Sequence, residues 1–157
     1  MLTIDTIHFG EMNITEERMI EFSHGLPGFE ELTNFIVVVP DESLPFAYLQ
    51  SVDSAEVSFL MADPFQFYGD YEFELSEAAQ AELEVSVPAD VQVRVIVTVQ
   101  ESLQSATMNL LAPIIINPVR RKGKQIVLHQ TSYTTKHSLI QVTSDAKSPT
   151  KAGESTC

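Results

Sequence analysis

The 157-residue chain has 22 acidic and 9 basic side chains, a formal net charge of −13 and a hydrophobic fraction of 44%. A chain of this length forms a single domain, and its excess of acid disfavours direct contact with nucleic-acid phosphates. The one cysteine, Cys157, cannot form an internal disulfide bond, which suits a reducing compartment.

We expect neither a secretory signal nor a membrane-spanning helix in this sequence. The N-terminus has no basic segment followed by an apolar run, and no apolar stretch approaches the roughly 20 residues of a membrane helix. We therefore expect a cytoplasmic protein that makes no contact with membranes. The charge is also uneven, since residues 1–101 carry −18 and the remainder +5. This asymmetry favours a basic partner, or it serves only solubility.

Alternation of apolar and polar side chains predicts strands along most of the chain. In residues 91–99 every odd position is valine, and in 70–75 Tyr71, Phe73 and Leu75 alternate with three carboxylates. Turn residues separate the predicted strands, which cover residues 2–9, 18–22, 35–39, 46–49, 57–61, 70–75, 91–99, 107–111, 114–116 and 125–129. Residues 84–88 are also strand-like.

One short helix interrupts this pattern. Ser76 can cap its N-terminus, Glu77 favours the first turn, and three alanines follow before an expected end near Leu83. Many short strands with little helix predict a mainly all-β protein, an antiparallel β-barrel-like single domain with one or two short helices. We place this domain at residues 1–141. Residues 142–157 have almost no large apolar side chains and are predicted to form a flexible polar tail.

The residue pattern predicts neither a catalytic nor a metal centre. The four histidines are scattered, without the spacing of metal ligands. Asp70, Glu72 and Glu74 repeat at about 7 Å along a strand, a spacing compatible with acid–base catalysis but far more common on a solvated face. Six of the 13 aromatic residues lie between Phe59 and Phe73, where core packing explains most of them and a partner-binding patch the rest.

Four sequence blocks resemble the FliW family of flagellar assembly factors. They are Phe-Ser-His-Gly-Leu-Pro-Gly-Phe-Glu at 22–30 with Pro-Phe-Ala-Tyr-Leu-Gln-Ser at 45–51, Phe-Leu-Met-Ala-Asp-Pro-Phe at 59–65 with Asp-Tyr-Glu at 70–72, and Asn-Leu-Leu-Ala-Pro-Ile-Ile-Ile-Asn at 109–117 with Gly-Lys-Gln at 123–125. Their order and spacing agree with the family over residues 2–141. The segment from 143 to 157 matches nothing in it.

This resemblance implies a β-barrel-like fold and a regulatory function without catalysis or cofactor. Family members bind newly made flagellin and, when free, the RNA-binding translational repressor CsrA. They antagonise the repressor non-competitively, which relieves repression of flagellin translation. An acidic protein docked beside an RNA-binding protein would repel incoming phosphate. We therefore select as partner-binding candidates Glu16, Glu17, Phe65, Asp70, Glu72 and Glu74. The alternatives are a small-molecule carrier that uses the barrel interior and, less favoured, an enzyme.

Overall fold

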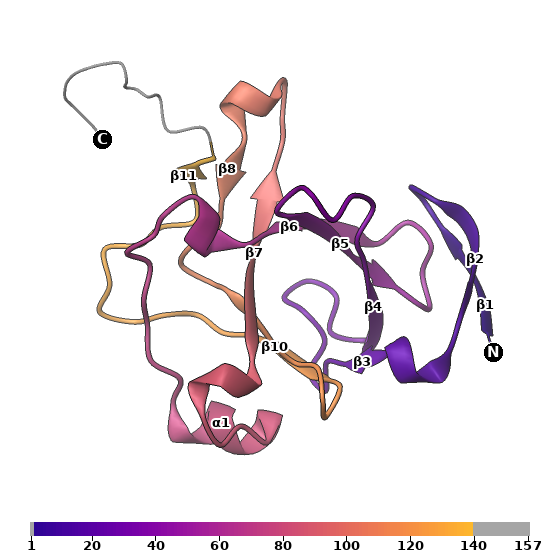
Figure 1. The fold of residues 1–157 in the computed structure, drawn as a ribbon, viewed down its shortest axis with the longest axis horizontal. Helices are drawn as coiled ribbons and strands as arrows, with labels where there is room; N and C mark the ends of the chain where they lie inside the picture. The colour runs from indigo at the N-terminus through magenta and orange to yellow at the C-terminus, as the bar shows by residue number, and fades with distance from the viewer. Residues whose placement is uncertain (1, 140–157) are drawn as a thin grey trace.

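A closed ring of seven strands forms the centre of the computed structural model, which describes residues 2–139 (Figure 1). Around the ring the order is β7-β6-β5-β4-β3-β10-β9, and pairing of β7 with β9 closes it. The strands are β3 (Ile20–Glu21), β4 (Asn34–Val38), β5 (Phe46–Ser51), β6 (Ser58–Ala62), β7 (Gln92–Thr98), β9 (Ile114–Asn117) and β10 (Lys122–Gln125). The mainly β, barrel-like prediction is confirmed. One pairing, between β3 and β10, is parallel, so the barrel is mixed and not purely antiparallel.

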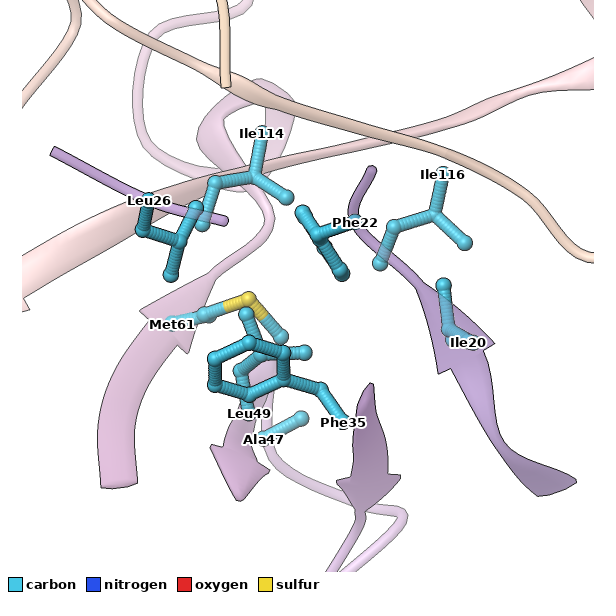
Figure 2. Close-up of a cluster of buried hydrophobic side chains, with 9 residues drawn as sticks. All are labelled: Ile20, Phe22, Leu26, Phe35, Ala47, Leu49, Met61, Ile114 and Ile116. Atoms are coloured by element: carbon cyan, nitrogen blue, oxygen red, sulfur yellow. The ribbon is translucent and has the colours of Figure 1, made fainter. Parts of the chain in front are cut away.

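Buried side chains fill the interior of this barrel. Figure 2 shows them converging from opposite strands: Ile20, Phe22, Leu26, Phe35, Ala47, Leu49, Met61, Ile114 and Ile116. The ring of Phe22 lies over Gly123 of β10, where even a Cβ atom would overlap it. A small barrel is usually filled by its own side chains. The packed interior contradicts the carrier hypothesis, which required a cavity inside the barrel.

Two further clusters pack on the outside of the barrel. The hairpin of β1 (Leu2–Thr6) and β2 (Gly10–Ile14) places Ile4 and Ile14 against Ile36 and Val38 of β4. At the other end of β7, the short strands β8 (Thr107–Met108) and β11 (His137–Ser138) extend the sheet. The buried side chains there include Met108, Leu110, Leu139 and Tyr71.

The predicted helix is confirmed as α1 (Glu77–Leu83), which packs against β10. The Ser76 hydroxyl accepts a hydrogen bond from the Ala79 N–H at 3.1 Å, and Glu84 ends the helix in the left-handed conformation with a φ of 57°. Within residues 2–139 the remaining helical segments are 3-10 turns: η1 (Glu16–Arg18), η2 (Pro64–Gln66), η3 (Pro88–Asp90) and η4 (Leu103–Ser105).

Several predicted strand positions are wrong. Residues 70–75 alternate between the inside and the outside as expected but pair with no strand, and 84–88 form turns that lead into η3. The C-terminal barrel strand lies at 122–125 and not at 125–129, while β2 and β11 were not predicted. The predicted boundary at 141 and the polar tail 142–157 lie outside the described residues.

Candidate functional site

A surface groove of about 760 Å³ separates the extended segment 71–75 from the beginning of β7. Both of its walls are largely apolar. The side chains that form them are Tyr71, Phe73 and Leu75 on one side and Val87, Val91 and Val93 on the other. Val87 keeps 51% of its surface exposed, so this wall is open to an incoming partner. Rigid aromatic and aliphatic side chains in a half-open hollow are typical of protein-binding surfaces.

The turn after β6 places Phe65 at one end of the groove. Asp63 caps η2, since its carboxylate accepts a hydrogen bond from the Phe65 N–H at 3.0 Å, and Pro64 occupies the first helical position. Phe65 consequently points away from the core with 45% of its surface exposed, although its ring lies 5.8 Å from that of Tyr71. An exposed phenylalanine beside an apolar hollow suits a binding contact better than a core role.

Tyr71 anchors the extended segment to the body of the protein. Its hydroxyl donates to the Leu110 carbonyl at 2.8 Å, and its ring packs edge-on against Tyr133 at 4.7 Å. Burial, with a smaller contribution from Tyr133, raises the pKa of the Tyr71 hydroxyl well above its ordinary value. The hydroxyl therefore stays protonated and can keep donating this hydrogen bond.

Carboxylates outnumber cations at the groove. Asp63, Glu72 and Glu74 line it together with one cation, Arg94. The Arg94 guanidinium donates to the carbonyl of the neighbouring Val93 at 2.7 Å, and neither Glu72 nor Glu74 forms an ion pair within the described chain. The groove therefore has largely apolar walls and an acidic rim, which consists of Asp63, Glu72, Glu74 and Arg94 and carries a formal net charge of −2.

The sequence-predicted site residues do not all come together. Phe65, Glu72 and Glu74 line the groove, and Asp70 lies exposed in the turn directly before it. Glu16 and Glu17 lie apart from them on η1, which precedes β3 on the other side of the ring (Figure 1). There the Glu16 carbonyl accepts a hydrogen bond from the Arg121 guanidinium at 2.7 Å.

Sequence reasoning missed the second wall of the groove. Val87, Val93 and Arg94 lay in segments predicted to be strands or strand-like, and nothing local shows which face of a valine-rich segment remains uncovered. The one available signal was Pro88. Its missing N–H makes a continuous strand through 84–88 unfavourable.

Three basic residues of the segment 120–124 form ion pairs with carboxylates. Lys124 pairs with Glu82 at 3.1 Å, while Arg120 and Lys122 each lie 3.6 Å from Glu84 at the end of α1. Their positive charges therefore offset carboxylates on the face that carries α1 and β10. Within the described residues, Asp63, Glu72 and Glu74 at the groove form no such ion pair, and Arg94 offsets only one of their three charges.

The described residues contain neither a metal-binding cluster nor a membrane-spanning helix. No three histidine, cysteine or carboxylate side chains within residues 2–139 are grouped as metal ligands would be. In the same part of the chain, no helix has the length and apolar character to cross a membrane.

Comparison with known proteins assigns the family. The family model described as FliW protein matches residues 3–139. The chain belongs to the FliW family. It is 44% identical over 143 residues to the flagellar assembly factor FliW of Bacillus pumilus (strain SAFR-032). This alignment covers 91% of this chain and 99% of that relative. Identity to the Bacillus subtilis (strain 168) protein of the same name is 44% over 138 residues, 88% of this chain and 96% of the relative.

The three-dimensional comparison agrees. A crystal structure of a flagellar assembly factor FliW superimposes with a TM-score of 0.85 at 36% identity, over 89% of this chain and 98% of the other. The chain is thus a flagellar assembly factor of the FliW family, a family without enzymatic function. Its partners are accordingly expected among flagellar proteins.

Proposed function

We propose that this FliW-family protein binds newly made flagellin in the cytoplasm and, when flagellin has been secreted, binds the translational repressor CsrA. Binding of CsrA weakens its hold on RNA non-competitively and so relieves repression of flagellin translation. Flagellin thereby controls its own synthesis through the free concentration of this protein.

The observation that carries the proposal is the net negative charge of the groove lining, where three carboxylates face the single guanidinium of Arg94. Residues 1–101 have a charge of −18, while three of the cations further along the chain are paired with Glu82 and Glu84. A repressor that holds RNA must present a basic surface, because phosphate contacts dominate such binding. Opposite potentials then steer the two proteins together.

The same charge supports antagonism without occupation of the RNA groove. Carboxylates docked within about one Debye length of the RNA path, ~8 Å at physiological salt, lower the positive potential that attracts phosphate. Because the effect acts through space, the protein and the RNA need not share contacts on the repressor.

The experiment is a titration of CsrA-bound fluorescent RNA with this protein. We expect RNA affinity to fall toward a limiting value, with a ternary complex detectable on the way, and purified flagellin to restore RNA binding. A strictly competitive curve that shows no ternary complex would contradict the non-competitive mechanism. Failure of both proteins to bind would overturn the proposed function as a whole.

A further inference from the structure

One wall of the groove is an extended backbone that pairs with no strand. From Tyr71 to Leu75 the side chains alternate between the inside and the outside, as in a strand. Within residues 2–139, however, the N–H groups of Phe73, Glu74 and Leu75 have no hydrogen-bond partner. The anchors lie at the two ends: the Glu72 N–H donates to the Tyr133 hydroxyl at 3.2 Å, and the Leu75 carbonyl accepts from Gln80 at 2.8 Å. The segment therefore resembles an edge strand held in place without a neighbour.

The opposite wall is also open on its groove side. Strand β6 pairs with β7 only through Met61 opposite Ile96 and Ala62 opposite Val95, and then turns away at Asp63. Toward the beginning of β7, from Gln92 to Arg94, only β9 pairs with it, on the other side. In place of a strand neighbour, the Val93 carbonyl accepts its hydrogen bond from the Arg94 side chain. No strand fills the space between the two walls.

We propose that this groove binds an extended segment of a partner protein, which adds as a strand to residues 71–75. Strand addition supplies affinity through main-chain hydrogen bonds and specificity through pockets for alternate side chains. Successive N–H groups of an extended chain point to opposite edges, and the edge of Glu72 and Glu74 is held by Tyr133. The free N–H groups of Phe73 and Leu75 on the other edge therefore supply the donors, and the apolar walls receive every second side chain.

The charge of the rim defines the composition of that segment. Its inward side chains are apolar, to cover Phe73 and Val87, and its outward side chains are lysine or arginine, to complement Asp63, Glu72 and Glu74. This inference rests on the proposed function only in requiring a protein partner, and it adds the conformation and composition of the segment that is bound.

The probe is a synthetic peptide of about eight residues in which valine and lysine alternate, long enough to span the segment. Two matched peptides serve as controls. In one, alternate backbone nitrogens are methylated, which removes main-chain hydrogen bonding but keeps every side chain. In the other, glutamate replaces lysine, which reverses the charge and keeps the alternation.

Titration of the full-length protein is followed by calorimetry and by amide hydrogen exchange. We expect the valine–lysine peptide to bind and to slow exchange at Phe73 and Leu75. The methylated and glutamate peptides should each bind at least about tenfold more weakly, because one loses backbone pairing and the other meets a like-charged rim.

Two variants with the same substitution locate the site. Val87→Asp places a charge on the apolar wall and should weaken binding of the valine–lysine peptide about tenfold. Val119→Asp, at a position 83% exposed and outside the groove, should leave it unchanged. Both native side chains are exposed, so the fold should tolerate both changes.

Equal affinity for the methylated peptide would overturn strand addition, as would a Val87→Asp variant that binds like the parent protein. Absence of any peptide binding would also overturn it. None of these results bears on whether flagellin and CsrA bind, which the RNA titration measures separately. Conversely, if the protein binds the peptide but binds neither flagellin nor CsrA, only the proposed function would be overturned.

Discussion

The closed ring of strands and the groove region beside β7 use similar sequence patterns in opposite ways. In the ring, each strand pairs on both sides over at least part of its length, and the side chains that face inward are removed from water. In the groove region, the segment 71–75 alternates just as regularly, but its backbone has no strand neighbour and the nearby Phe65 and Val87 remain about half exposed. The ring is closed by pairing of its own strands, whereas no strand pairs with the segment 71–75 that forms one wall of the groove.

This difference separates stability from binding. Apolar burial stabilises the ring at roughly 25 cal/mol per Å² removed from water, so loss of its side chains should affect folding. The exposed side chains of the groove gain that stabilisation only when a partner covers them. Substitutions there should alter association and leave the free energy of unfolding nearly unchanged.

The greatest difference in stability is expected between alanine substitutions of two phenylalanines, Phe22 and Phe65. Phe22→Ala, in the barrel interior, should lower the free energy of unfolding by about 3–5 kcal/mol, because it removes a fully buried ring and leaves a cavity. Phe65→Ala should lower it by less than about 1 kcal/mol. Urea denaturation of both variants measures the difference. Similar losses would show that Phe65 belongs to the core and not to a binding surface.

A smaller loss is expected at Asn117, which joins α1 to the ring. Its buried amide donates to the Leu83 and Glu84 carbonyls at 2.8 and 3.2 Å, so Asn117→Ala leaves helix-end carbonyls unpaired. We predict a loss of about 1–3 kcal/mol. The matched control, Asn13→Ala, removes only an exposed hydrogen bond with Thr3 and should cost less than about 0.5 kcal/mol. Equal effects would mean that Asn117 does not hold the helix.

Local signals in the sequence were sufficient for elements that depend on their own residues. The valines of 91–99 predicted β7, and Ser76 with its following alanines predicted α1. The pairing of strands could not be predicted in the same way. Residues 70–75 have the side-chain alternation of a strand, but whether a neighbour lies beside them depends on distant parts of the chain.

The position of β10 and the groove could not be predicted either, because both depend on contacts with distant parts of the chain. Lys122–Gln125 contains Gly123 and two lysines, a poor strand sequence by composition, yet the ring of Phe22 requires a glycine there. For the candidate site, three of the residues selected from the sequence as partner-binding candidates, Phe65, Glu72 and Glu74, line the groove, and their role in binding stays a prediction. Val87 and Arg94 became recognisable only when the structure showed which surfaces remain uncovered.

The smallest expected effect concerns residues 142–157, which composition assigns to a polar tail. A chain that ends at residue 141 should melt within about 1 °C of the full-length protein, because the deleted residues contribute little apolar burial. Thermal denaturation of the two chains tests this. A fall of several degrees would place the end of the folded domain beyond residue 141.

If the acidic rim of the groove attracts the repressor, the rate of association with the repressor should depend on the rim carboxylates. Asp70→Asn, Glu72→Gln and Glu74→Gln together remove three charges at or beside the groove. The matched control, Asp5→Asn, Glu11→Gln and Glu56→Gln, removes three exposed charges that do not line it.

Stopped-flow association with CsrA is measured at several salt concentrations for both triple variants and the parent protein. Electrostatic steering can raise an association rate constant from about 10⁵–10⁶ to 10⁸ M⁻¹s⁻¹ or more at low salt. We predict that the groove variant associates several-fold more slowly than the control variant and depends less on salt. Identical rate constants and salt dependence for the two triple variants would show that the groove carboxylates are only a solvated face, and would contradict the account.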